Sequence, residues 1–159
     1  MASRTDTKGL EFVERSPAWL RWGGGGFLLL IGTVVGVAAV TESRWQLFLL
    51  TAAFCAAAAW WSLVAKVTAV VGEDTITLGG PFWTRTLPRK DVSRVSVDVD
   101  NGLNQGLVNW PVTSLERRTL TRLNMGGAAA VSFAAAGHRY QFVLADRRSA
   151  QQLAAALET

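Results

Sequence analysis

The chain has 159 residues, a formal net charge of +4 and 50% hydrophobic residues, which leaves room for about one domain. Its single cysteine, Cys55, excludes an intramolecular disulfide. From Lys66 onward there are eleven Lys or Arg and eight Asp or Glu. An excess this small suits the anionic face of a membrane better than a nucleic acid duplex, so no nucleic acid partner is expected.

Two apolar runs, residues 23–40 and 45–64, are separated only by a polar tetrad, and neither run contains a charged residue. A helix of about nineteen residues rises ~28 Å at ~1.5 Å per residue. This length matches the ~30 Å thickness of the hydrocarbon core of a bilayer. The sequence therefore predicts a two-helix transmembrane hairpin at residues 23–64, preceded at residues 1–22 by a cytoplasmic tail with an interfacial lead-in.

The residues beside the two runs support this interpretation. Tryptophans stand where membrane interfaces are expected, namely Trp19, Trp22, Trp45, Trp60 and Trp61. Four basic residues precede the first run and Lys66 follows the second, while the loop has only Arg44. The positive-inside rule then predicts an inner (plasma) membrane protein with both termini cytoplasmic. A cleaved signal peptide is the alternative for the first run, and the three acids before that run argue against it.

Small residues favour close packing of the two predicted helices. Gly32 and Gly36 form a Gly-x-x-x-Gly spacing in the first run, and the second run supplies alanines that include Ala52 and Ala56. We expect these faces to pack on each other within one chain, with homodimerisation as the alternative. The absence of ionisable groups from both runs argues against transport.

After Lys66 the apolar residues alternate, which is typical of strands. Turn residues such as Gly79, Gly80 and Pro81 separate the segments. Strands are predicted at residues 67–71, 75–78, 82–87, 92–99, 128–133 and 139–145. Residues 101–124 carry no clear pattern. A C-terminal helix is predicted from a capping box that starts at Ser149, with Asp146 just upstream.

This layout resembles the bacterial PH-like domains that follow paired transmembrane helices in small actinobacterial membrane proteins. The segments that carry the resemblance are the apolar hairpin and residues 75–80, 86–92, 140–144 and 153–157. It implies a membrane α-helical hairpin plus an α+β PH-like domain at residues 65–159. Its bent antiparallel sheet would have six or seven strands, capped by the C-terminal helix. Most proteins of this kind have no assigned activity, so the resemblance implies a fold and a location.

The sequence contains none of the common catalytic motifs, including the P-loop, His-Glu-x-x-His, Cys-x-x-Cys and Gly-x-Ser-x-Gly. One His and one Cys inside an apolar run cannot build the usual nucleophile and base pairs. His138 follows Gly137 at a predicted hairpin tip, where we expect it to be solvated. We therefore predict no catalytic residue, no metal ligand and no cofactor.

The remaining candidates are contact residues. Trp110, in a predicted loop beside Pro111, is a candidate anchor at an interface. The basic residues that could contact a partner or lipid headgroups are Arg85, Arg89, Lys90, Arg94, Arg117, Arg118 and Arg122. Acidic residues lie among them in the sequence, so an ordinary solvated surface is the alternative.

Three hypotheses follow. The first is a non-enzymatic adaptor or accessory subunit, anchored in the lipid bilayer, that binds a membrane or membrane-associated protein partner at the cytoplasmic face. The second is a sensor of anionic lipid headgroups that uses the basic residues. The third is an enzyme acting on a membrane lipid, for which the sequence offers no catalytic group.

Overall fold

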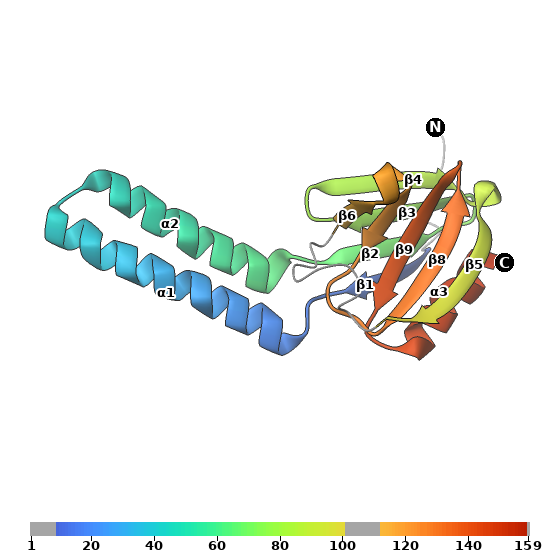
Figure 1. Cartoon of the computed structure of the whole chain (residues 1–159), viewed down its shortest axis with the longest axis horizontal. Helices are drawn as coiled ribbons and strands as arrows, with labels where there is room; N and C mark the ends of the chain where they lie inside the picture. Colours follow the sequence, from blue (N-terminus) through green and yellow to red (C-terminus); the bar gives the residue numbers. More distant parts are fainter. Residues whose placement is uncertain (1–8, 101–111, 159) are drawn as a thin grey trace, which may run out of the picture. The chain divides into compact units, whose positions relative to one another are not determined.

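The computed structural model describes residues 9–100 and 112–158, apart from the side chain of Arg117. The chain forms two compact units. Ser16–Ala65 is the helical unit, and Met1–Arg15 together with Lys66–Thr159 is the sheet unit. Figure 1 labels the elements of each unit.

The helical unit is an antiparallel pair of helices. Helix α1, Ala18–Glu42, begins directly after Pro17 and is followed by Ser43, which adopts a left-handed conformation with φ 52°. Helix α2, Trp45–Ala59, continues into a π-helical turn, Trp60–Val64. The two candidate spans have 25 and 20 residues and mean hydropathies of 2.0 and 1.9, so both are long and apolar enough to cross a membrane.

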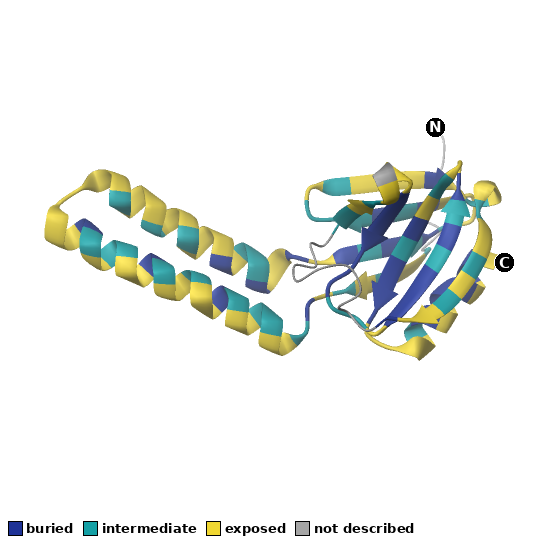
Figure 2. Ribbon diagram, in the orientation of Figure 1, coloured by how far each residue is buried: buried dark blue, intermediate teal, exposed yellow. Residues whose placement is uncertain are grey.

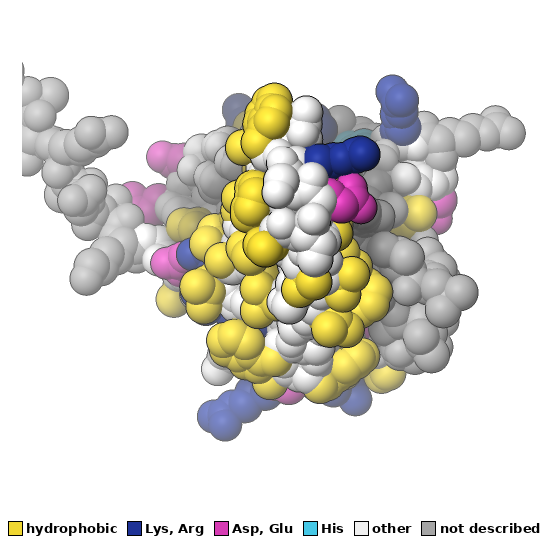
Figure 3. Space-filling view, turned by 90° about the vertical axis from the view of Figure 1, so that its left-hand side faces the viewer, with side chains coloured by type: hydrophobic (Ala, Val, Ile, Leu, Met, Phe, Trp, Pro, Cys, Tyr) yellow, Lys and Arg dark blue, Asp and Glu magenta, His cyan; other side chains and the backbone are white. Residues whose placement is uncertain are grey.

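Most of the apolar surface of the helical unit is exposed, as Figure 2 shows. Only 17% of the first span and 11% of the second is buried. Side chains such as Phe27, Val34 and Leu49 are more than half exposed. Hydrophobic side chains also dominate the end of this unit seen in Figure 3. A surface this apolar requires lipid or another apolar partner to cover it.

The contact between α1 and α2 is made by small residues of α1. A Cβ placed on Gly32 would lie 3.2 Å from the Cβ of Phe54, and one on Gly36 would lie 3.4 Å from Cγ2 of Thr51. Gly25, Gly32 and Ala39 are buried. The predicted small-residue face of the first run therefore lies in the intrachain contact.

The partner face of α2 differs from the predicted one. Ala52 and Ala56 are exposed, while Ala58 and Ser62 are buried and Thr51 is half-buried. A helix turns about 100° per residue, so positions 51, 58 and 62 share one face of α2 and its π-helical turn. Ala52 and Ala56 lie outside that face. Alanine occurs on both faces, at positions 52 and 56 and at position 58, so composition alone did not distinguish the faces.

Sheet A of the sheet unit has four antiparallel strands in the order β1-β2-β3-β4. Their bounds are Leu10–Glu14, Val67–Val71, Thr75–Gly80 and Trp83–Pro88. Strand β1 was not predicted, because its residues were interpreted as an interfacial lead-in. It instead pairs with β2, from Leu10 opposite Val71 to Glu14 opposite Val67. Residues 10–14 therefore lie at one edge of sheet A.

Sheet B has five strands in the order β5-β8-β9-β7-β6. In chain order they are β5 Ser93–Val99, β6 Val112–Leu115, β7 Leu120–Leu123, β8 Ala129–Ala135 and β9 His138–Leu144. Strands β7 and β9 are parallel and the other pairs are antiparallel. The described strands thus form two sheets and not one bent sheet, and the sheet unit has an α+β layout.

Helix α3, Arg147–Glu158, buries Ala150, Leu153, Ala154, Ala156 and Leu157 and contacts β5, β8 and β9. The helix starts earlier than predicted. Asp146 accepts hydrogen bonds from the backbone N–H of Ser149 at 2.9 Å and from its hydroxyl at 2.9 Å. The predicted cap at Ser149 is therefore wrong, because the stronger acceptor three residues upstream caps the helix.

Candidate functional site

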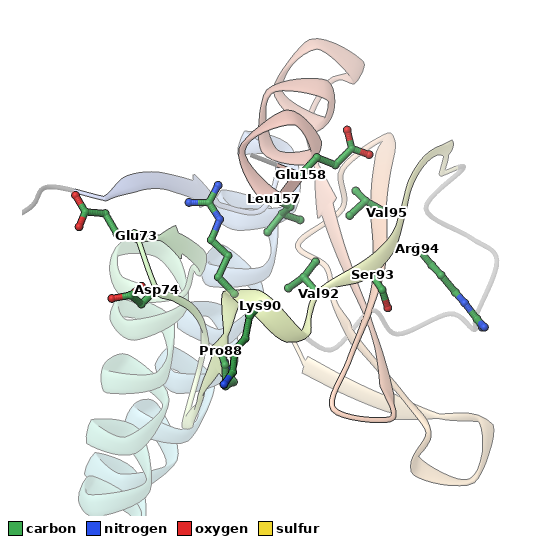
Figure 4. Close-up of a pocket in the computed structure, with 11 residues that line it drawn as sticks. Glu73, Asp74, Pro88, Lys90, Val92, Ser93, Arg94, Val95, Leu157 and Glu158 are labelled. Carbon is green, nitrogen blue, oxygen red and sulfur yellow. The ribbon is translucent and has the colours of Figure 1, made fainter.

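A groove with a volume of about 910 Å³ lies on the sheet unit. It lies among the turn between β2 and β3, the 3₁₀ turn Arg89–Asp91, the start of β5 and the end of α3. Figure 4 shows Val92, Val95 and Leu157 converging on its centre. Apolar side chains therefore form the floor of the groove.

Charged side chains of both signs surround this floor. Glu73, Asp74 and Glu158 contribute carboxylates, and Lys90 and Arg94 contribute cations. In Figure 4 the two acids of the β2–β3 turn lie on one side of the floor and Arg94 lies on the other. The candidate basic contact residues Lys90 and Arg94 therefore have acids near them in space as well as in sequence.

Arg89 also lines the groove, but its guanidinium bonds within the fold. It donates from Nη1 to the carbonyl of Gly72 at 3.1 Å and from Nη2 to the carbonyl of Ala156 at 2.5 Å. Ala156 is in the last turn of α3, where unpaired carbonyls and the helix dipole favour a cation. Arg89 therefore holds the β2–β3 turn against the helix end and shapes the groove, in place of the predicted contact role.

Arg122 is a second predicted contact residue that the fold uses internally. Its Nη2 lies 2.8 Å from Oδ2 of Asp100, and the two side chains are 5% and 3% exposed. This contact is an ion pair without hydrogen-bond geometry, while Nη1 donates a directed bond to Oε1 of Gln141 at 2.7 Å. Arg122 is thus unavailable to an outside partner.

Arg85 takes part in an aromatic cluster. Its guanidinium carbon lies 5.6 Å from the ring centroid of buried Tyr140, in cation–π geometry. The ring of Tyr140 lies 4.9 Å from that of His138, and Nε2 of His138 lies 2.8 Å from Oγ1 of Thr121. His138 was expected to be solvated and is half-buried, because strand alternation places it on the same face of β9 as Tyr140 and Phe142.

The pKa values in this cluster shift for physical reasons. Desolvation, with a smaller contribution from the positive charge of Arg85, lowers the pKa of His138. Desolvation raises the pKa of Tyr140. The neutral imidazole can donate a hydrogen bond to the Thr121 hydroxyl or accept one from it. Thr121 is only 7% exposed, so a substrate would have little access to its hydroxyl. The arrangement is therefore suited to packing more than to attack on a substrate.

The other predicted contact residues are dispersed. Lys90, Arg94 and Arg118 are exposed. Arg118 has φ 72°. Arg94 has φ 55° and lies where the register between β5 and β8 shifts. Trp110 and the side chain of Arg117 lie outside the described residues. Within residues 9–100 and 112–158, no group of three or more His, Cys, Asp or Glu could hold a metal ion.

The turn between β3 and β4 has an unusual backbone that the sequence analysis missed. Gly80 pairs with Trp83 across the two-residue connection of Pro81 and Phe82. Phe82 has φ 58° and is 94% exposed. Proline fixes φ near about −65°, so the two residues follow the pattern of a type II turn, whose second central position normally holds Gly or Asn.

Comparisons with protein-family models, curated proteins and solved structures give no match to this chain.

Proposed function

We propose that this protein is a non-enzymatic adaptor, anchored in a membrane by α1 and α2, whose PH-like sheet unit binds a protein partner at the cytoplasmic face. The groove between the β2–β3 turn and the end of α3 is the proposed partner site. The observation that carries the proposal is the groove's composition, an apolar floor bordered by charges of both signs.

Membrane anchoring is supported by the exposed apolar surface of the helices. Seventeen and eleven per cent of the two spans are buried, so lipid is the natural cover for the rest. The spans carry no charged side chain from residue 23 to residue 40 or from residue 46 to residue 65. An anchor needs no intramembrane ionisable group, whereas ion and proton pathways usually do.

A polypeptide suits the groove better than a lipid headgroup does. Interfaces between proteins combine an apolar centre with a polar rim, which is how Val92, Val95 and Leu157 lie among the charged residues. An anionic headgroup favours clustered cations, but Arg89 bonds to carbonyls and Arg122 is buried. Glu73, Asp74 and Glu158 would further repel it.

The partner site is tested by affinity purification of the full chain in mild detergent. We expect a stoichiometric protein partner, and we expect the double variant Lys90→Glu/Arg94→Glu to lose it by reversing the charge of two exposed cations that line the groove. Arg147→Glu is the matched control, because Arg147 is exposed and lies outside the groove lining. Recovery of the chain alone, or equal recovery of the partner by all variants, contradicts the proposal.

The orientation is tested separately in intact cells with Cys55 replaced by Ala. A cysteine at Ser43, in the turn between the helices, should react with a membrane-impermeant thiol reagent. A cysteine at exposed Arg147 should react only after the membrane is permeabilised. The reverse pattern overturns the cytoplasmic placement of the sheet unit.

A further inference from the structure

We infer that the β3–β4 turn is a second membrane contact, in which the Phe82 side chain enters the interfacial layer of the bilayer that the helices cross. The inference rests on the proposed membrane anchoring and adds a lipid-contacting site on the sheet unit. Three features of the turn carry it, namely its backbone, its position in sheet A and its side-chain chemistry.

The backbone at Phe82 is kept in a conformation that disfavours its side chain. At φ 58° the Cβ of an L-residue crowds its own backbone, and only glycine avoids this cost. Gly or Asn normally occupies this position of a type II turn. Strained residues cluster at functional sites, and the side chain at this strained position is an aromatic ring that is 94% exposed.

The register of sheet A places this turn at the end of the sheet where the chain enters and leaves the helices. Glu14 pairs with Val67, Thr68 pairs with Gly79, and Gly80 pairs with Trp83, so these residues lie along one end of the sheet. Figure 1 shows the β3–β4 turn at the same end of sheet A as the start of β2.

The connections between the helices and this end of sheet A are short. Two residues separate Val64 from Val67, and three separate Glu14 from Ala18. At ~3.5 Å per residue, these connections span at most about 10 Å and about 14 Å. The end of a spanning helix lies at the membrane interface. The short connections therefore keep this end of sheet A close to that interface.

The chemistry of the turn matches that environment. Aromatic rings are favoured at the interface between lipid and water, where the ring is buried among headgroups and acyl chains. Trp83 follows Phe82 directly and is half-buried, and Pro81 adds a further apolar side chain without a backbone donor. Nearby Lys66 is exposed and suits the anionic surface of the same layer.

The test uses the full chain with Cys55 replaced by Ala, in nanodiscs of phosphatidylcholine and phosphatidylglycerol. A nitroxide on Thr84→Cys reports the depth of the turn through its accessibility to oxygen and to a water-soluble nickel chelate. We expect a lipid-like accessibility ratio with Phe82 present. The variant Phe82→Gly should lose it and reach the aqueous value, while keeping the fold because glycine accepts φ 58°.

Two further nitroxides separate the possible results. Ala136→Cys, at the exposed β8–β9 turn with φ 51°, supplies a matched aqueous control without an aromatic side chain. Val34→Cys, exposed in the middle of α1, should be deep if α1 spans the bilayer. An aqueous Thr84 nitroxide beside a deep Val34 nitroxide, or equal depth with Phe82→Gly, overturns this inference alone. An aqueous Val34 nitroxide overturns the anchoring and this inference with it.

Discussion

Arg122 and Asp100 form an almost completely buried ion pair, with Nη2 and Oδ2 2.8 Å apart and side chains that are 5% and 3% exposed, respectively. Each charge in such a pair depends on the other, because an unpaired buried charge has lost its hydration without compensation. The hydrogen bond from Arg122 to Gln141 adds a second partner within the same sheet. We therefore regard Arg122 as a determinant of the stability of sheet B.

Breaking this pair on one side should destabilise the sheet unit strongly. We expect Arg122→Met to lower the free energy of unfolding by about 3–5 kcal/mol, and Asp100→Asn to lower it by a similar amount. The double variant should lose less than the sum of the two. Chemical denaturation of the full chain in detergent, followed by tryptophan fluorescence, measures these values, and additive effects would show that the two groups do not interact.

Arg89 should stabilise the end of α3 through its two carbonyl contacts. Replacing it with Lys keeps the charge but removes the planar fork that reaches both Gly72 and Ala156. We expect a loss of about 1.5–3 kcal/mol, with faster amide hydrogen exchange in the last turn of the helix. Lys90→Ala, at the exposed neighbouring position, is the control. Unchanged exchange in Arg89→Lys would contradict the assigned role.

The α1–α2 contact should tolerate added volume at one glycine and not at another. A Cβ on Gly32 meets the Cβ of Phe54 at 3.2 Å, whereas a Cβ on Gly26 meets nothing within 4 Å. We expect Gly32→Val to destabilise the helical pair by about 1–3 kcal/mol through overpacking. Gly26→Val should have little effect on the pair. Thermal unfolding of both variants in the same detergent compares them, and equal behaviour would place the helix contact elsewhere.

His138 should make the sheet unit less stable in mild acid. Its pKa is lowered in the folded state from an ordinary value of 6.5, so the unfolded chain binds the proton more readily. Stability is then full above pH 6.5 and falls as the pH drops toward the folded-state pKa. Denaturation at pH 7.5 and 5.5 should show a smaller pH effect for His138→Gln than for the unmodified chain. The same pH dependence in both would exclude this role.

Local patterns predicted most of the regular elements. The strand predicted at residues 67–71 coincides with β2, and the other predicted strands overlap β3, β4, β5, β8 and β9. Alternation and turn residues are properties of neighbouring positions, so they can be recognised without knowing what each strand packs against. The same holds for the apolar helices, whose length and lack of charge are visible directly.

The elements that were missed depend on distant partners. Strand β1 is recognisable only through β2, which follows more than fifty residues later. Strand β7 pairs in parallel with β9, although β8 lies between them in the chain. Pairing of this kind depends on residues far apart in the chain, and a four-residue strand has too short a pattern to predict by itself.

The candidate site shows the same division. The sequence by itself determined two membrane-length helices, a strand-rich unit and a set of candidate contact residues, because hydrophobic length and alternation are local. Only the tertiary structure decided that Arg122 is buried against Asp100, that Arg89 holds the end of α3, and that Lys90 and Arg94 border an apolar groove. Burial and charge pairing arise between segments, so identical arginines in the sequence acquire different roles in the fold.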